Sequence, residues 1–278
     1  MSEKNCLVDT LSTNSLGALI GSEAPPMQTV HFLGRVFPEP VNVTLSSPPV
    51  ITWQATEIGA SLEFVTHIVD SHIDIECRLT GYLPEYFALI YMRAFDICRA
   101  QVDLVAFKSG LGLTVVLETF IDPNGAATKI LLQNESLAAL CTAFTLDDGF
   151  DQVCSHVLRS IPLFMALRDL IAAISLPHVS PVDCARAIER LKHLIASPDS
   201  GEKQAWQQLR QALQIHETYL KFITSHSANP RHGQPGHIPG AVTSEVTRRA
   251  WVIMNRYFEY LKRGSIPLSP TDFPLLSG

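Results

Sequence analysis

One connection near the C-terminal end of the chain gathers residues that can do chemistry. Residues 225–240 contain three histidines, one arginine, three prolines and three glycines. An imidazole titrates near neutrality, so it can take a proton from a hydroxyl group or return one to a leaving oxygen. An arginine can hold a phosphate group and stabilise charge on it. Because the prolines and glycines restrict and bend the backbone, we expect an ordered loop between two helices.

Three interpretations of this loop stay open. In the first, Arg231 and His232 cap helix ends or donate hydrogen bonds to loop carbonyls, and His226 interacts with the end of the preceding helix. In the second, His226, His232 and His237 bind zinc through three imidazoles, although their spacing matches no common type of zinc site. The third interpretation is catalysis without a metal or a cofactor, by Arg231, His232 and His237.

The third interpretation follows from a family resemblance. Arg231 is followed directly by His232, and five residues separate it from His237. This spacing, just before the last helix of a predicted bundle, resembles the motif of the HEPN superfamily, and the resemblance covers residues 150–264. It implies metal-independent cleavage of RNA, in a dimer whose two motifs face each other. The family motif usually lies at a helix start, whereas the glycines and prolines here predict a loop. The C-terminal segment also looks like a class of uncharacterised bacterial proteins, to which we attach no activity.

The first half of the chain is typical of an α+β domain. Residues 1–27 are rich in Ser, Thr, Gly and Pro and predict a flexible N-terminal arm. Residues 28–134 follow, and within them residues 72–79 alternate apolar and polar side chains, which indicates a strand with one buried and one solvated face. We expect a small antiparallel sheet and one long helix, with strands at 31–37, 50–53, 62–69, 72–79, 113–121 and 128–133 and the helix at 84–105.

Two turns in this half have clear sequence signals. Asp70 and Ser71 can join the two central strands as a hairpin, and residues 122–125 read Asp-Pro-Asn-Gly, which favours a tight turn. Four polar residues of this hairpin could form a polar cluster: His67, His72, Asp74 and Glu76. The alternation already explains them as the solvated side of the hairpin. We expect this half to sense or bind something, although it carries no recognisable binding motif.

Residues 135–278 predict an all-α helical bundle of four or five helices. Apolar side chains recur at helical spacing in four segments, at 163–174, at 180–195, at 206–225 and from Thr243 or Ser244 to Gly264. Ser180 is expected to cap the second of these helices, with Pro181 in its first position and Asp183 completing a capping box. His216 falls on the apolar stripe of the third, where we expect a satisfied core residue.

The composition excludes several classes of protein. A net charge of −6 argues against binding of nucleic acid by bulk electrostatics. We find no apolar run long enough to span a membrane and no secretory signal, so we expect a cytoplasmic protein without membrane partners. Six widely spaced cysteines indicate reduced, mostly buried thiols. No Walker loop, no G-x-S-x-G and no H-E-x-x-H motif is present.

We therefore predict a non-catalytic binding or regulatory protein of bacterial type, whose helical bundle mediates dimerisation as a homodimer. The alternative is a HEPN-like metal-independent ribonuclease, or an RNA-binding effector, that uses Arg231 and His237. Convergence of these two side chains in an open cleft favours the alternative. Burial of both against carbonyls or carboxylates favours the first prediction.

Overall fold

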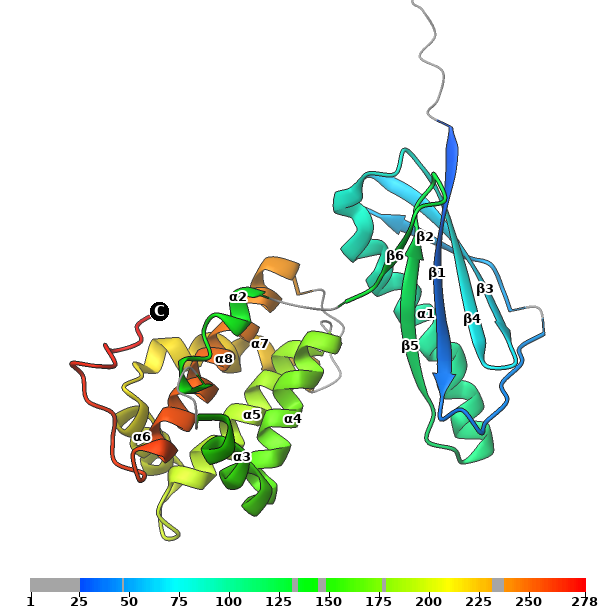
Figure 1. Cartoon of the computed structure of the whole chain (residues 1–278). Coiled ribbons are helices and arrows are strands. Elements are labelled where there is room, and N and C mark those ends of the chain that lie inside the picture. Colours follow the sequence, from blue (N-terminus) through cyan, green and yellow to red (C-terminus); the bar gives the residue numbers. More distant parts are fainter. Residues whose placement is uncertain (1–25, 47, 132–134, 145–148, 177–178, 232–237) are drawn as a thin grey trace, which may run out of the picture. The chain divides into compact units, whose positions relative to one another are not determined.

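The computed structural model describes residues 26–46, 48–131, 135–144, 149–176, 179–231 and 238–278. The chain divides into two compact units, Met1–Leu131 and Leu132–Gly278, and each unit has its own hydrophobic core. The predicted fold class is confirmed: the first unit is an antiparallel sheet with one long helix, and the second consists of helices (Figure 1).

Six strands form one antiparallel sheet in the first unit, in the order β2-β3-β4-β1-β5-β6. The helix α1 (Phe87–Ser109) lies across one face of this sheet, and a short 3-10 helix, η1 (Pro84–Tyr86), leads into it (Figure 1). Each predicted strand is present with its ends shifted by a few residues: β1 (Met27–Phe37), β2 (Ile51–Ala55), β3 (Ala60–Val69), β4 (His72–Thr80), β5 (Thr114–Ile121) and β6 (Ala127–Lys129).

Alternation along the strands places apolar side chains between the sheet and α1. On β4, every second residue from Ile73 to Leu79 is buried, and the residues between them lie on the other face. Their partners are the buried residues of α1: Ile90, Tyr91, Ala94, Ile97, Cys98 and Val102. Burial raises the pKa of the Cys77 and Cys98 thiols to about 12. Both therefore act as small apolar core residues, as predicted.

The predicted turn between β3 and β4 is confirmed. Asp70 and Ser71 both have left-handed backbone conformations, with φ of 52° and 64°, as a two-residue hairpin turn of the primed type requires. The Ser71 hydroxyl accepts a hydrogen bond from the Val43 amide at 3.0 Å and donates one to the Val41 carbonyl at 2.6 Å. These bonds hold the segment that precedes β2 against the hairpin.

Strand β5 contains a bulge opposite β1. Leu33 pairs with Thr119 and Gly34 pairs with Leu117, so Glu118 is the extra residue. The strands approach closely here, because a Cβ atom on Gly34 would lie 2.1 Å from a main-chain carbonyl oxygen of β5. Glycine in a strand interior often marks such an approach. The bulge brings Glu118 and Thr119 together on the face of the sheet that α1 does not cover.

In the second unit, α5 lies at the centre of a group of helices. It packs against four of its neighbours, α4, α6, α7 and α8, through buried side chains that include Cys184, Ile188 and Leu191. The helices are α2 (Glu135–Ala138), α3 (Gly149–Arg159), α4 (Ile161–Ser175), α5 (Ser180–Ile195), α6 (Glu202–Leu213), α7 (Glu217–Arg231) and α8 (Gly240–Lys262), with the 3-10 helix η2 (Thr142–Phe144). In the described residues beyond 134, β structure is limited to one isolated bridge between Ile215 and Leu276.

The predicted single helix over residues 206–225 is wrong, because two helices occupy this region. Gln214 ends α6 with a left-handed φ of 53°, and the buried Ile215 pairs with the C-terminal segment instead of continuing the helix. His216 is consequently exposed and bonds to the Thr218 hydroxyl at 2.8 Å. The prediction of His216 as a core residue is therefore also wrong.

Other helix ends differ from the prediction in informative ways. Ser180 does not cap α5: it lies inside the first turn, buried, with its hydroxyl 2.7 Å from that of Thr247 on α8. Helix α7 continues to Arg231 and includes Pro230, because a proline near a C-terminal end removes only one backbone hydrogen bond. Helix α8 ends as predicted, with Gly264 in a left-handed conformation at φ 72°.

The bulge makes a prediction about Gly34. Because an added Cβ would collide with the backbone of β5, Gly34→Ala should lower the free energy of unfolding by about 3 kcal/mol. Urea denaturation measures this change. Gly112→Ala is the control, since a Cβ at Gly112 meets no atom within 4 Å, and equal unfolding midpoints for the two variants would contradict the account of the bulge.

Candidate functional site

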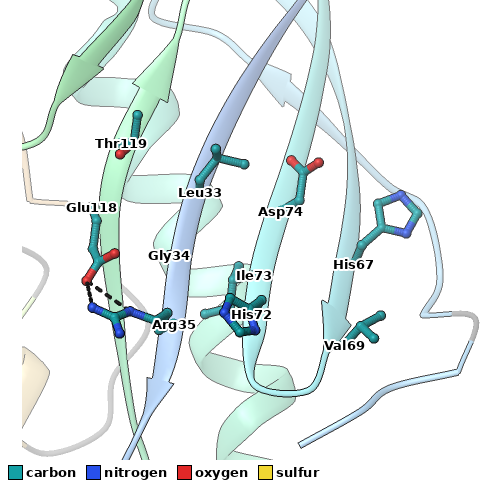
Figure 2. A pocket seen from close by; sticks show the side chains of 10 residues that line it. All are labelled: Leu33, Gly34, Arg35, His67, Val69, His72, Ile73, Asp74, Glu118 and Thr119. Atoms are coloured by element: carbon teal, nitrogen blue, oxygen red, sulfur yellow. Dashed lines mark hydrogen bonds and ion pairs between the residues drawn. The ribbon is translucent and has the colours of Figure 1, made fainter. Parts of the chain in front are cut away.

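The face of the sheet opposite α1 carries a set of charged and polar side chains from β1, β3, β4 and β5. Neighbouring strands align them in rows, so that His72 lies between Val69 and Arg35 and Asp74 lies between His67 and Leu33. Figure 2 shows these side chains spread over the three central strands and β5. The alternation that buries the opposite set of side chains against α1 therefore assembles this surface.

An ion pair joins β1 to the bulge in β5. Arg35 donates to the same oxygen of Glu118 from Nη2 at 2.9 Å and from Nε at 3.3 Å (Figure 2). A second carboxylate, that of Glu39, lies 3.3 Å from Nη1. The hydrogen bond to Glu118 and then its charge raise the pKa of Arg35. The guanidinium is thus already neutralised by groups of its own chain.

Two further contacts connect charged groups on β1 and β4. The His31 Nδ1 atom lies 2.9 Å from Asp74 Oδ1, and both side chains are partly exposed. Arg78 Nε lies 2.7 Å from Glu76 Oε1. The hydrogen bond from Arg78 lowers the pKa of Glu76, and the charges of Arg78, His31 and His67 act in the same direction, whereas burial opposes them. His31, Arg35 and Arg78 on this face therefore each have a carboxylate partner close by.

A shallow, open depression of about 560 Å³ lies on this face. Exposed apolar side chains accompany the charges: Val69 is 54% exposed and Val116 41%. The depression is lined by Leu33, Gly34, Arg35, His67, Val69, His72, Ile73, Asp74, Glu118 and Thr119 (Figure 2). In the part of the chain that the structure describes, no group of three or more His, Cys, Asp or Glu side chains is arranged to hold a metal ion. The site therefore offers apolar contact and hydrogen bonds.

Of the three residues predicted to be catalytic, the structure describes only Arg231. It is the last residue of α7, and its Nη1 atom lies 2.9 Å from Glu189 Oε1 of α5, with both side chains 36% exposed. His232 and His237 lie outside the described residues. His226, inside α7, packs its ring edge-on against Phe222 at 4.9 Å between centroids. Among the described residues, Arg231 thus meets a carboxylate of α5.

Several basic residues of α8 bind groups of the same chain. Arg256 is buried and donates to the carbonyls of Leu213, Gln214 and Pro274 at 2.6–2.9 Å. Burial lowers its pKa. Lys262 donates to the Ala143 carbonyl at 2.8 Å. These cations hold the helical unit together.

A network at the start of α8 connects it to α7. Glu245 accepts hydrogen bonds from Arg248 at 2.7 and 2.8 Å and from Arg249 at 2.7 Å. Arg249 also stacks over the rings of Tyr219 and Phe222, at 4.7 and 4.1 Å from their centroids. The hydrogen bond from Arg248 is the main reason why the pKa of Glu245 falls to about 2. This network fixes α7, and therefore Arg231, against α8.

Two family models match the chain, and both carry the same family name. The model described as Domain of unknown function (DUF8168) N-terminal domain matches residues 30–131, and the model described as Domain of unknown function (DUF8168) C-terminal domain matches residues 150–262. The chain belongs to this two-domain family. The two DUF8168 domains coincide with the sheet unit and the helical unit. No curated protein and no solved structure matches the chain significantly.

Sequence reasoning missed the ion pair between Arg35 and Glu118, because the contact depends on which strands pair and in which register. The alternation with the buried Val115 and Leu117 places Glu118 on the solvated face, but the pairing of Arg35 with Val116, which brings Glu118 beside Arg35, leaves no signal in the sequence. Gly34, a glycine inside an otherwise regular strand, is the signal for the bulge next to this contact. Within the described residues, moreover, no helix combines the length and apolar character that crossing a bilayer requires.

The network around Glu245 predicts a pH-dependent contribution to stability. Glu245→Gln should lower the free energy of unfolding at pH 7 by about 1 kcal/mol, a value kept small because the carboxylate is partly solvated. The folded-state pKa of about 2 lies below the ordinary value of 4.5. The stabilisation is therefore present above pH 4.5 and is lost as the pH falls towards 2.

Urea denaturation of both proteins across this pH range measures the effect. Glu217→Gln is the comparison, since the pKa of Glu217 is lowered mainly by the hydrogen bond from the exposed Lys221 on the surface of α7; because this pair is solvated, its loss should destabilise the chain less than that of Glu245. A destabilisation by Glu245→Gln that stays constant down to pH 2 would show that the charge of Glu245 is not responsible.

Proposed function

We propose that the protein is a non-catalytic binding or regulatory protein of bacterial type, whose sheet binds a protein partner on the face opposite α1. The observation that carries this proposal is the uncovered face itself. Its charged groups are already paired, and apolar side chains such as Val69 and Val116 stay exposed between them. Interfaces between proteins combine apolar contact with paired polar groups in this way.

A protein partner fits this face better than a nucleic acid does. Binding of nucleic acid depends on cations that are free to neutralise phosphates. Here Arg35 and Arg78 contact carboxylates at 2.9 and 2.7 Å, so phosphates would have to displace groups of the same chain. The carboxylates of Asp74 and Glu118 retain open acceptor positions. We therefore expect a partner segment that supplies apolar side chains and hydrogen-bond donors.

The proposal includes a homodimer, formed by the helical unit, in the cytoplasm. Large apolar side chains stay exposed on α3 and α4, with Leu158 at 81% and Ile161 at 78%, and exposed apolar patches commonly mark interaction sites. The five cysteines in the described part of the chain are free thiols, which agrees with a reducing compartment.

The alternative proposal is RNA cleavage or RNA binding by Arg231 and His237. The specific observation in its favour is the exposure of the pair between Arg231 and Glu189, which lies at the surface. Surface ion pairs are weak, so a phosphate can compete for this guanidinium. Glu189 also lines a depression of about 410 Å³ with Lys203, Arg210 and Lys221. The two proposals are separated by direct assays.

Selection from a library of displayed peptides tests the binding proposal. Peptides selected on the purified full chain should combine apolar residues with Lys or Arg, and they should lose at least about tenfold in affinity for Val69→Lys, since this change places a bulky charge beside the depression. Fluorescence anisotropy with the labelled peptides measures the affinity.

Val50→Lys is the matched control, because Val50 is 56% exposed, as Val69 is 54% exposed, but does not line the depression. Peptides that bind both variants equally, or a selection that yields no binding peptide, would count against the sheet face as the binding surface.

Incubation with total cellular RNA tests the alternative. If the protein is not a nuclease, the wild type, Arg231→Ala and His237→Ala should leave identical RNA profiles, equal to that of buffer without protein. Gel electrophoresis resolves the products, and EDTA in a parallel series removes metal-dependent contaminants. Cleavage by the wild type that both substitutions abolish would replace the binding proposal with the nuclease.

A further inference from the structure

Helix α4 is apolar on both of its faces. The inner face contributes Leu163, Ala166, Leu170 and Ala173 to the core of the helical unit. The outer face carries Ile161, Phe164 and Ile171, which are 78%, 47% and 49% exposed. A helix that is apolar all round is normally buried on all sides. In a single copy of this unit, one side of α4 therefore lacks the cover that its sequence favours.

The outer face also carries a cation for which the described residues supply no partner. Arg168 is exposed and follows Phe164 by one helical turn. Among the described residues it has no hydrogen-bond or ion-pair partner, whereas the neighbouring Asp169 points inward to Arg186 and Arg190. Arg168 therefore stays available to a group outside the unit. Its planar guanidinium favours the face of an aromatic ring.

The order of the four outward residues is symmetric. Ile161, Phe164, Arg168 and Ile171 follow one another at intervals of three, four and three residues, so they are arranged evenly about position 166. Consider two such helices that pack antiparallel, with the two-fold axis at the level of position 166. Each of the four residues then faces the residue of the other helix that lies equally far from position 166 on its opposite side. Ile161 then meets Ile171 of the second copy, and Phe164 meets its Arg168.

We propose, as a deepening of the self-association proposed above, that this stripe of Ile161, Phe164, Arg168 and Ile171 on α4 is the dimer interface and that its partner is α4 of a second copy. The arrangement is isologous, so one stripe supplies both sides of the contact and the assembly closes at two copies. Each Arg168 stacks on Phe164 of the other copy, which avoids a contact between like charges. Apolar pairs flank this centre, as in stable interfaces.

Sedimentation equilibrium of the full chain tests the proposal through charge substitutions. Phe164→Lys opposes a new cation to Arg168 of the other copy and should weaken the dimer at least about a hundredfold. Phe164→Glu opposes an anion to the same Arg168, so its dimer should be about tenfold tighter than that of Phe164→Lys. The double variant Phe164→Glu with Arg168→Glu should dissociate as Phe164→Lys does.

Matched controls separate the interface from folding. Phe107→Lys changes the same residue type in the sheet unit, where Phe107 is 90% exposed, and should leave association unchanged. Thermal melting by circular dichroism checks that each variant is folded. Ile161→Lys, at the more exposed end of the stripe, replaces Phe164→Lys if the latter fails to fold.

The possible outcomes distinguish the α4 interface from the broader proposal that the helical unit forms a homodimer. If none of the substitutions on α4 weakens the dimer, the chain still self-associates, but α4 is not its interface. Equal weakening by Phe164→Lys and Phe164→Glu would overturn the pairing of Phe164 with Arg168. A wild-type chain that is monomeric at every concentration would remove both the homodimer and this interface, while leaving the binding function of the sheet to its own test.

Discussion

A single helix covers one face of a six-stranded sheet, and the first unit is organised by this constraint. Since α1 buries only one side, the strands place most of their large apolar residues on that side and most of their charged residues on the other. The same alternation that builds the core between Ile75 and Ile90 therefore also builds the row of His67, Asp74 and Leu33 on the opposite face. The fold of the first unit and its candidate site therefore both result from the alternation of apolar and polar residues along the strands.

The polar groups on both units are used mainly within the chain. On the sheet, Arg35 binds Glu118, and in the helical unit Arg256 binds three carbonyls while Glu245 binds two arginines. A protein that grips phosphates or performs acid–base chemistry usually keeps such groups free or strongly perturbed. On the sheet face, exposed apolar side chains lie beside charges that are already paired. The proposal of a protein partner rests on this pattern.

The sequence predicts those features that depend on local periodicity. The β3–β4 hairpin, its Asp70–Ser71 turn and the end of α8 at Gly264 all follow from residues that are neighbours in the chain. Features that depend on distant contacts are not predictable in this way. Helix α6 ends at Gln214 because Ile215 pairs with Leu276, and Ser180 leaves its expected cap position to bond with Thr247.

The candidate site is also predictable only in part, because some of its features follow from local periodicity and others depend on distant contacts. The solvated side of the hairpin, with His67, His72 and Asp74, follows from alternation alone. The pairing of β4 with β1 does not follow from it. Alternation with Val115 and Leu117 also places Glu118 on this face, but its position beside Arg35 comes from the pairing of β5 with β1, which no periodic pattern records. Arg231, His232 and His237 match a motif in the sequence, but His232 and His237 lie outside the described residues, so the geometry of the motif stays a prediction. The family models, which match both units, add the two-domain organisation and no chemistry.

Covalent footprinting of histidines in the living cell tests the central claim most directly. Diethylpyrocarbonate modifies exposed imidazoles, so labelling can be compared between the purified chain and the same chain in the cells that produce it. If a protein partner covers the sheet face, His67 and His72 should be protected in cells relative to His216, which is exposed on the helical unit. Equal labelling of all three histidines in both settings would contradict the account.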